Sequence, residues 1–477
     1  MQTKQYPNVI GKNIIKDFSK IIEVISPINN QVVGIIPRVS TKVEIENIFK
    51  EAKSTFSWWK DSNYQDRKNK ILKFINLVEK KQNELAEIMM WEIAKTKHES
   101  LNEIQRSLQY IKETIVEYEN IINNPLIIDE TKHHVKGKVG KFIYQPLGVV
   151  LAISPFNYPF NLLIAKIIPA LISGNVVVYK PASQGSIIGS YVGVLLYKSG
   201  FNEGQISCLI GKGSEIGDIF IKNENIDMIT FTGSTSIGKK ITKEKQMIPL
   251  VLELGGKDPA IVLHDADLEL VSNEIIKGSF GYNGQRCTAI KRVLVDSRIH
   301  EKLKKLLDQK IAKLSVGTAL EPNDITELIS KKSLDYNLTL IDDALNQGAT
   351  THQEIKKDGL ILHPIILDNV NLDMKIAWEE PFGPILPIIE FKSIDDAIEI
   401  ANQSEYGLQA SIFTSNLKQA HEIALKLESG TININRAPSR GPDIFPFSGV
   451  KNSGFGIQGI RDAIFSMNRI KGIIDND

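Results

Sequence analysis

Cysteine is scarce in this sequence of 477 residues, which contains only 2 cysteines, Cys208 and Cys287. Two cysteines cannot build a framework of disulfides, so the simplest expectation is a reducing, cytoplasmic setting. The first residues, MQTKQYPNVIGKN, lack the apolar core of a signal peptide. No apolar run approaches the ~20 residues that a membrane-spanning helix needs. We therefore expect neither secretion nor a membrane partner.

Net charge is also nearly absent, because the formal charge at pH 7 is +1. A protein with so weak a field is not drawn to nucleic acid, and we expect no nucleic-acid partner. His133 and His134, in KHHVKGK, have no further ligands at metal-site spacing, so no metal is predicted. The apolar content of 42% and the charged content of 24% are those of a soluble globular protein. The length suggests two large domains or roughly three smaller ones.

Short apolar runs alternate with helical patterns along most of the chain. The segment Thr41–Trp59 begins with a candidate capping residue, Thr41, and places apolar residues at helical spacing. The short apolar runs typical of strands are 149–154, 175–181, 206–211, 228–233 and 250–256. A second alternating series extends from about Lys257 to about Phe447. This alternation predicts an α/β fold with parallel, doubly wound sheets.

One strand-to-helix turn has the features of a phosphate site. In FTGSTSIGKKI a predicted strand ends at Thr232, a Gly-Ser turn follows, and a helix begins. Free amides and the dipole at a helix N-terminus attract phosphate. The G-x-x-x-x-G spacing matches neither the Rossmann fingerprint nor a P-loop, so a plain turn remains an alternative. Lys180, at the end of another predicted strand, is by the same reasoning either a ligand or a solvated end residue.

The two cysteines differ in their surroundings. Cys287, in FGYNGQRCTA, follows two glycines and lies next to Arg286. A polar, flexible setting beside a permanent positive charge favours the thiolate, which is the nucleophilic form. Cys208 lies in the apolar run ISCLIG, and we expect it to pack in the core.

Further motifs accompany these segments in a fixed order over more than half of the chain. They are SPFNYPFN (154–161), KPASQ (180–184), FTGSTSIG (231–238), LELGGKDP (252–259), FGYNGQRC (280–287) and WEEPFGP (378–384). Together they resemble the aldehyde dehydrogenase superfamily, in particular its Glu-Leu-Gly-Gly segment and its Phe-x-x-x-Gly-Gln-x-Cys segment. The resemblance extends from near the N-terminus to the last predicted helix.

The resemblance implies three catalytic residues. Cys287 is the expected nucleophile, which converts an aldehyde into a tetrahedral hydride donor. The side-chain amide of Asn157 and the backbone N–H of Cys287 are the expected oxyanion donors. Glu253 is the expected general base for hydrolysis of the thioester that follows. Without the resemblance, a capping or ion-paired Glu253 and a turn-forming Asn157 are the ordinary interpretations.

The resemblance also implies a cofactor site and indicates which cofactor it takes. Many NAD-preferring relatives carry a glutamate at the place of Ser183, where a carboxylate would repel a 2′-phosphate. Here KPAS supplies Lys180 and a neutral hydroxyl, which predicts a preference for NADP. The remaining residues expected to contact the cofactor are Pro155, Gly233, Ser234, Gly255, Glu380 and Phe382.

The substrate expectation comes from one branch of the superfamily. RCTAIKRVLV and RGPDIFPFSGVKNSGFGIQG resemble the non-phosphorylating glyceraldehyde-3-phosphate dehydrogenases, which oxidise the triose phosphate directly to 3-phosphoglycerate. That resemblance places Arg106, Tyr158, Arg286 and Arg440 around the phosphate and hydroxyl of a phosphorylated aldehyde. Arginine suits this role because its planar guanidinium can donate two parallel hydrogen bonds to a pair of phosphate oxygens. Solvated arginines are the alternative for Arg106 and Arg440.

Several other functions remain open at this point. Arginines also bind carboxylates, so a succinate-semialdehyde or related dehydrogenase is an alternative. A CoA-acylating relative is disfavoured, because a general base at Glu253 points to water as the acyl acceptor. A catalytically silent structural relative is disfavoured by the intact set of Cys287, Glu253 and Asn157.

The family architecture implies three parts. These are an NADP-binding domain (1–122 and 147–255), a catalytic domain with the nucleophile (256–447), and a small β arm for oligomerisation (123–146 and 448–477). The expected fold is therefore aldehyde dehydrogenase-like, with two doubly wound parallel-sheet domains and the arm. Because unpaired edge strands need covering, we expect a homotetramer formed as a dimer of dimers.

Overall fold

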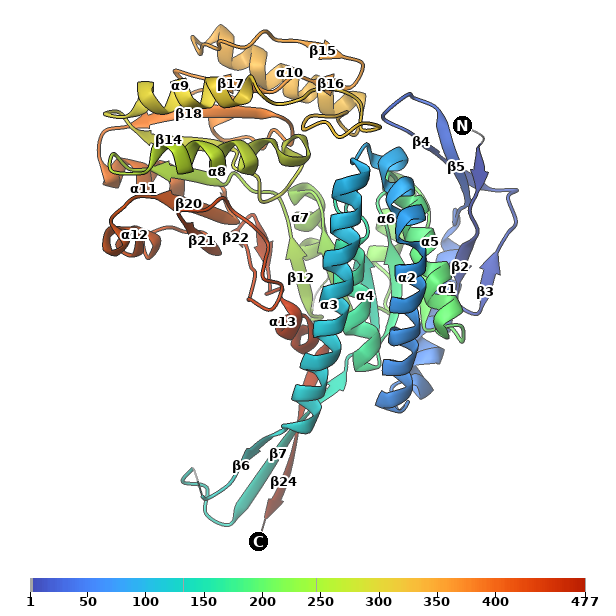
Figure 1. Cartoon of the computed structure of the whole chain (residues 1–477). Coiled ribbons are helices and arrows are strands. Elements are labelled where there is room, and N and C mark those ends of the chain that lie inside the picture. Colours follow the sequence, from blue (N-terminus) through green and yellow to red (C-terminus); the bar gives the residue numbers. More distant parts are fainter. Residues whose placement is uncertain (1–2, 132, 246, 477) are drawn as a thin grey trace.

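Two parallel sheets, each covered by helices, and a slender three-stranded arm make up the fold (Figure 1). The structure is a computed structural model that describes residues 3–131, 133–245 and 247–476. The predicted α/β class with two doubly wound parallel sheets is confirmed. Among the described helices, none is both long and apolar enough to cross a bilayer.

The larger sheet has 8 strands in the order β23-β12-β11-β8-β9-β10-β2-β3. Its central parallel strands are β8 (Val149–Ile153), β9 (Val176–Lys180), β10 (Ile206–Cys208), β11 (Met228–Thr232) and β12 (Leu250–Glu253). These are the apolar runs expected from the sequence, and β8, β9 and β11 are buried throughout because helices cover both faces. Antiparallel edges are added by β2 (Asn8–Ile10), β3 (Asn13–Ile15) and β23 (Gly454–Phe455).

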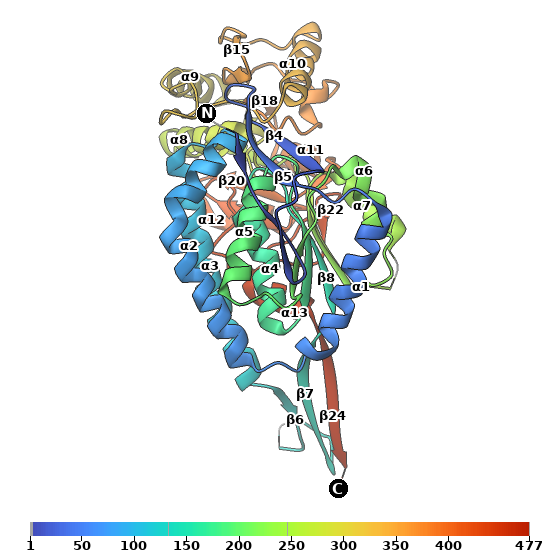
Figure 2. The same ribbon diagram turned by 90° about the vertical axis from the view of Figure 1, so that its right-hand side faces the viewer.

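Helices lie on both sides of this sheet. One side carries α2 (Tyr64–Ile93), α3 (Lys97–Asn123), α4 (Asn161–Ser173) and α5 (Ser186–Ser199). Figure 2 shows α1 (Lys42–Trp59) on the opposite side, where it packs beside α6 (Gly213–Ile221). The helix α7 (Thr235–Glu244) connects β11 to β12. The predicted cap of α1 is confirmed, because the Thr41 hydroxyl accepts a hydrogen bond from the Glu44 amide.

The smaller sheet has 6 strands in the order β17-β18-β14-β13-β20-β21, and all neighbours are parallel. Its strands are β13 (Pro259–Val262), β14 (Arg292–Asp296), β17 (Ile365–Leu367), β18 (Ile385–Phe391), β20 (Gln409–Phe413) and β21 (Thr431–Ile434). Its helices are α8 (Leu268–Phe280), α9 (His300–Ile311), α10 (Lys331–Asn346), α11 (Ile394–Asn402) and α12 (Leu417–Ala424), with the 3₁₀ turns η1 (Gly281–Gly284) and η2 (Lys375–Ala377).

Short strands complete the two lobes. They are β1 (Lys4–Gln5), β4 (Ile21–Ile25) and β5 (Val32–Pro37) in one small sheet, β15 (Lys357–Asp358) with β16 (Ile361–Leu362), and β19 (Tyr406–Gly407) with β22 (Val450–Lys451).

The arm is a three-stranded antiparallel sheet of β6 (Leu126–Ile128), β7 (Lys138–Pro146) and β24 (Asn468–Asn476). The predicted C-terminal arm segment, 448–477, is too broad. Within it, β22 pairs with β19 of the smaller lobe and β23 pairs with β12 of the larger sheet. The helix α13 (Ile460–Ser466) packs on α3 and α4. The exposed edge of β12 needs a partner and takes β23, so only β24 reaches the arm.

Candidate active site

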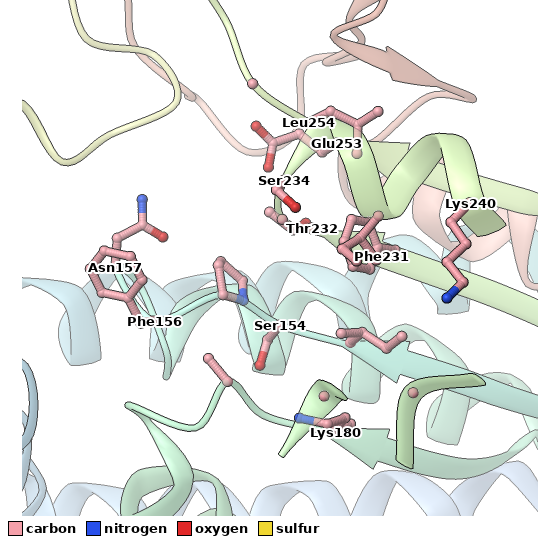
Figure 3. A pocket seen from close by; sticks show the side chains of 18 of the residues that line it. Ser154, Phe156, Asn157, Lys180, Phe231, Thr232, Ser234, Lys240, Glu253 and Leu254 are labelled. Carbon is pink, nitrogen blue, oxygen red and sulfur yellow. The ribbon is translucent and has the colours of Figure 1, made fainter. Parts of the chain in front are cut away.

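A cavity of about 730 Å³ lies where strands of the larger sheet end, facing the smaller lobe. The strands β8, β9, β11 and β12 are parallel, so their carboxyl ends and the loops after them converge on this space. Figure 3 shows the side chains of Asn157 and Glu253 at one end and those of Lys180 and Lys240 toward the other. Cys287, Glu380 and Phe382 line the cavity from the smaller lobe.

The loop that carries Cys287 is held rigidly, although the sequence suggested flexibility. Gly284 has φ +68, and a Cβ there would lie 2.3 Å from the carbonyl oxygen of Gly383. Only glycine therefore fits this backbone. The Asn283 side chain accepts a hydrogen bond from the Thr326 amide at 2.7 Å, and Gln285 Oε1 accepts one from the Ile329 amide at 2.9 Å. These bonds fix the backbone immediately before the nucleophile.

The structure corrects the expected activation of Cys287. Burial, and next the charge of Glu253, raise the pKa of the Cys287 thiol well above its ordinary value, while Lys291 and Arg440 lower it. Arg286 does not supply the activating charge, because its guanidinium donates to the carbonyls of Lys277 and Gly278 at the end of α8. In this state of the protein the thiol is therefore the favoured form.

Cys208 behaves as expected of a core cysteine. It is fully buried in β10, and burial raises the pKa of its thiol to about 12.

The Asn157 amide faces the nucleophile loop. Its Nδ2 donates to the Gln285 carbonyl at 2.9 Å, and its Oδ1 accepts from the Tyr158 amide at 3.1 Å. The second bond is the turn contact considered from the sequence, so the side chain makes both kinds of contact. Because an amide nitrogen has two hydrogens, Nδ2 retains one donor for an oxyanion beside Cys287.

Glu253, the last residue of β12, is 2% exposed. Within the described chain, neither carboxylate oxygen makes a hydrogen bond of normal geometry and no ion pair involves this residue, although the Cys287 thiol lies close enough for the carboxylate to raise its pKa. The capping and ion-pair alternatives therefore do not hold among these residues. A buried polar group without a partner is costly and is typical of a functional site.

Most of the predicted cofactor residues line the cavity. Its lining includes Pro155, Lys180, Gly233, Ser234, Gly255, Glu380 and Phe382. Ser183 is exposed and lies outside the lining, although its neighbour Ala182 belongs to it.

The donors in the cavity fit a phosphate-bearing dinucleotide. The helix α7 begins after Ser234 with no side chain capping its first amides, so these N–H groups can bind an anion. Lys180 Nζ donates only to the Pro181 carbonyl, at 3.1 Å, among the hydrogen bonds of the described residues. Burial lowers the pKa of Lys180 to about 8. An anionic ligand near this ammonium would favour its charged form.

Two lysines that the sequence did not single out adjoin the site. Lys291 Nζ donates to the Cys287 carbonyl at 2.7 Å and to Glu380 Oε1. Lys166, on the apolar helix α4, donates to the Thr232 hydroxyl at 2.7 Å. Burial is the main cause that lowers the pKa of Lys166 to about 7. A single lysine within NLLIAKIIPALIS is the sequence signal that would have found it.

The structure joins two of the predicted substrate residues. Arg106 binds both carboxylate oxygens of Asp443, at 2.8 and 3.0 Å, and also donates to the Arg440 carbonyl. The Arg440 guanidinium donates to Gln458 and lies 5.3 Å from the centre of the Phe447 ring. Both arginines are thus engaged rather than simply solvated.

The set of substrate residues is incomplete in one respect. None of the described contacts connects Arg286 with Arg106 or Arg440, because the Arg286 guanidinium turns to α8. None of the four, Tyr158 included, lines the large cavity.

Among the described residues no cluster of histidine, cysteine and acidic side chains is arranged to hold a metal ion.

Comparison with known proteins agrees with this geometry. The family model described as Aldehyde dehydrogenase family matches residues 14–473. A Streptococcus equinus protein named NADP-dependent glyceraldehyde-3-phosphate dehydrogenase is 40% identical over 472 residues, covering 99% of each chain. A Pisum sativum protein of the same name is 42% identical and covers 91% of this chain and 88% of its own. The crystal structure of the NADP-dependent glyceraldehyde-3-phosphate dehydrogenase of Bacillus halodurans C-125, complexed with NADP, is 42% identical with a TM-score of 0.96 and covers 100% of both chains. The resemblance seen in the motifs is confirmed, and the chain belongs to the aldehyde dehydrogenase family.

Proposed function

We propose that this protein oxidises D-glyceraldehyde 3-phosphate to 3-phosphoglycerate with NADP and without inorganic phosphate. The observation that carries the chemistry is the meeting of Cys287, Asn157 and an unpartnered Glu253 at one end of a cavity. The names of the relatives, at 40% and 42% identity, support the choice of substrate and cofactor.

Cys287 begins the reaction. Its thiol loses a proton, and the thiolate attacks the aldehyde carbon to form a thiohemiacetal. The free N–H of the Asn157 amide and the backbone N–H of Cys287 stabilise the oxyanion, and both are preorganised by the bonds that fix their loops.

The cofactor-binding residues would hold NADP in the cavity. The start of α7 and Lys180 would bind its phosphates, Glu380 its nicotinamide ribose, and Phe382 would line the nicotinamide site. When bound, the oxidised nicotinamide supplies the chemistry of hydride acceptance.

Glu253 completes the reaction. Hydride loss leaves a thioester on Cys287, which water must cleave. The Glu253 carboxylate has both oxygens free of protein partners, so it can accept a proton from the attacking water. Release of the acid returns the cysteine to its starting form.

The preference for NADP rests on charge at the adenosine end. By the family resemblance, Lys180 and Ser183 take the positions at which a carboxylate would repel a 2′-phosphate; Lys180 lines the cavity, and Ser183 lies beside its lining residue Ala182. A higher kcat/KM with NAD than with NADP would contradict this part of the proposal.

An arginine cluster supports an anionic substrate. Arg106 donates to the Arg440 carbonyl and pairs with Asp443, which holds these two arginines next to each other. Arg440 is close enough to Cys287 to lower the pKa of its thiol, so its charge acts at the reacting centre. We propose that Arg106, Tyr158 and Arg440 contact the phosphate and hydroxyl, and that Arg286 joins them only if it leaves α8.

The apolar surface of the arm supports the proposal that the protein assembles into a homotetramer. Its strands expose apolar side chains, namely Leu126, Ile127, Val139, Ile470, Ile473 and Ile474. An exposed apolar patch of this kind marks a protein interface. We propose that the arm pairs subunits as a dimer of dimers.

The test is NADPH formation from D-glyceraldehyde 3-phosphate and NADP in buffer free of inorganic phosphate. We expect fast turnover, with 3-phosphoglycerate as the product. Succinic semialdehyde, at equal concentration, is the comparison substrate.

Two outcomes would overturn parts of the proposal. Turnover of the semialdehyde alone would retain the Cys287 chemistry and replace the substrate. Turnover retained by Cys287→Ser would remove the nucleophile assignment; we expect this variant to be inactive while still binding NADP.

A further inference from the structure

Lys95 occupies an unusual place in the turn between α2 and α3. Its side chain is 2% exposed and pairs with Glu103, which is 1% exposed, at 2.5 Å. Taking two charges out of water is costly, and a buried pair of this kind is by itself weak support for stability. The other contacts of Lys95 indicate what the pair does.

The pair holds the loop that carries Asn157. Lys95 Nζ donates to the Asn157 carbonyl at 3.1 Å. Glu103 Oε1 accepts hydrogen bonds from the amides of Phe160 and Asn161, at 3.0 and 2.9 Å. The segment from Asn157 to the start of α4 is therefore fastened at both ends by one ion pair.

The same ammonium contacts the loop that carries Cys287. Lys95 Nζ lies 3.6 Å from the ring centre of Tyr158 and 4.8 Å from that of Tyr282. The two rings meet edge-on, with centres 6.3 Å apart. Tyr282 belongs to η1, five positions before Cys287, and its hydroxyl donates to the Ile93 carbonyl at the end of α2. A desolvated cation between two aromatic rings is strongly attracted to both.

Lys95 thus bridges the two loops that must supply the oxyanion donors. One donor is the Asn157 amide and the other is the backbone N–H of Cys287. Stabilisation of an oxyanion requires both donors within hydrogen-bond distance of one oxygen, so the relative position of the loops decides it. Asn157 Nδ2 already bonds to the Gln285 carbonyl, which shows that the loops are in contact.

We propose that Lys95 is a positioning residue for the oxyanion site. Through its contacts with Glu103, Tyr158 and Tyr282 it fixes the position of the Asn157 loop relative to the Cys287 loop. This inference rests on the proposed oxyanion role of Asn157. It does not depend on which aldehyde is the substrate or on which cofactor is used.

Two reagents separate positioning from general damage. With 4-nitrophenyl acetate, Cys287 Sγ attacks the ester carbonyl, the bond to 4-nitrophenolate breaks, and a thioester forms through an oxyanion. With iodoacetamide, Sγ displaces iodide without an oxyanion. Loss of positioning slows the first reaction alone, whereas loss of fold or of thiol reactivity alters both.

The variant for the test is Lys95→Met combined with Glu103→Gln. Methionine keeps the length that packs between the rings, and glutamine keeps an acceptor for the two amides. The double variant is used because the single variant Lys95→Met would leave the Glu103 charge buried and unpaired, which by itself can prevent folding. The Cys287→Ser variant measures the rate at which each reagent reacts with groups other than Cys287.

We expect acylation of Cys287 by the ester to fall about tenfold to a hundredfold, as when an oxyanion donor is displaced. The rate of alkylation by iodoacetamide should change less than about threefold, because that reaction forms no oxyanion. The control is Lys68→Met, which removes another ion pair between α2 and α3, at 2.5 Å to Glu119, and should change neither rate. Unchanged ester acylation, or an equal fall in both reactions, would overturn the proposal.

The test also distinguishes this inference from the proposed function. A wild-type protein that ignores triose phosphate but reacts with the ester at Cys287 overturns the substrate and leaves the role of Lys95 open to measurement. A wild-type protein whose ester reaction does not need Cys287 overturns both.

Discussion

At the scale of single residues, Glu253 and Cys287 form a coupled pair in a buried setting. Burial and the neighbouring Glu253 carboxylate, through its charge and its contact with the thiol, raise the pKa of Cys287. The same contact lets the carboxylate serve as a proton acceptor during thioester hydrolysis. Replacing Cys287 and replacing Glu253 are therefore expected to stop the reaction at different steps.

Glu253→Gln keeps the volume of the side chain and removes the base. We expect one equivalent of NADPH per active site, followed by a stall, because the thioester forms but is not hydrolysed. Steady-state turnover should fall about a hundredfold or more. Rapid mixing measures the burst, and mass spectrometry detects the acyl adduct on Cys287.

Glu379→Gln serves as the control for that experiment. Glu379 precedes the cofactor residue Glu380, but it does not line the cavity, and its carboxylate accepts from Tyr336. Normal turnover by Glu253→Gln would remove Glu253 from the mechanism.

Lys291→Met should make the nucleophile less reactive. Lys291 lowers the pKa of the Cys287 thiol, whereas burial and Glu253 raise it, and Arg440 lowers it as well. Losing the lysine therefore raises that pKa, and at a pH below it the thiolate fraction falls about tenfold for each unit of the rise. The rate of alkylation by iodoacetamide, followed from pH 6 to pH 10, measures the change.

The wild-type alkylation rate should itself keep rising with pH past the ordinary thiol range, because the folded pKa is raised. A plateau at or below about pH 9.5 would contradict this, because an unperturbed thiol titrates near 8.5 and is almost fully ionised about one pH unit higher. Lys68→Met, which removes the ion pair with Glu119 near the start of α2, should reproduce the wild-type profile.

The sequence predicted which residues meet better than it predicted their surroundings. The family resemblance singled out Cys287, Glu253 and Asn157, and all three line one cavity. The direction in which Arg286 turns was not readable from the sequence, because its partners are the backbone carbonyls of Lys277 and Gly278, which the fold and not a local pattern brings to it. Lys95 and Lys291 were missed because burial of a lysine leaves no local pattern, and because each has a partner far away in sequence, Asn157 for Lys95 and Glu380 for Lys291.

At the scale of elements, the loop before Cys287 is the most constrained segment of the site. Gly284 has a positive φ, and its α-carbon faces the Gly383 carbonyl of the segment that carries the cofactor residues Glu380 and Phe382. The loop thus fixes the nucleophile relative to a second functional segment as well as to α8.

Gly284→Ala should disrupt this contact. The new Cβ would lie 2.3 Å from the Gly383 oxygen, and φ +68 is strained for alanine. We expect a loss of roughly 1–3 kcal/mol in the free energy of unfolding, together with a fall in kcat. Urea unfolding and steady-state kinetics measure the two effects.

Gly348→Ala is the matched control for the backbone strain. Gly348 also has a positive φ, +100, but nothing lies within 4 Å of the position of its Cβ. The difference between the two variants isolates the steric contact. Equal behaviour of the two would mean that the packing against Gly383 does not position Cys287.

Element prediction succeeded where periodicity was strong. The buried runs of β8, β9 and β11 and the cap of α1 were apparent from local pattern alone. The two-residue strands β22 and β23 were not, because their only cause is an edge supplied by distant residues. Short strands of this kind have no periodicity to read.

At the scale of the whole molecule, the arm projects from the larger lobe, at the end of the molecule opposite the smaller lobe (Figures 1 and 2). Ile470 and Ile474 are 55% and 57% exposed and lie on one face of β24, since strand residues four apart point the same way. Exposed isoleucines on a strand favour association.

Replacing both with aspartate should therefore dissociate the assembly. We expect Ile470→Asp with Ile474→Asp to lower the sedimenting mass in analytical ultracentrifugation while the far-ultraviolet circular dichroism stays unchanged. Leu425→Asp is the control, because Leu425 is 89% exposed at the end of α12, outside the arm. An unchanged mass, or a wild-type protein that is already monomeric, would contradict assembly through this face.

The arm also has a consequence for the order of events during protein synthesis. Its last strand, β24, ends at the C-terminal end of the described chain, while its partner β7 is made long before, and the two pair along all of β24. During synthesis one edge of β7 therefore stays open until β24 has been made, because the two strands lie far apart in the sequence. The proposed joining of subunits through the completed arm follows that step, and its rate depends on the concentration of chains with a complete arm.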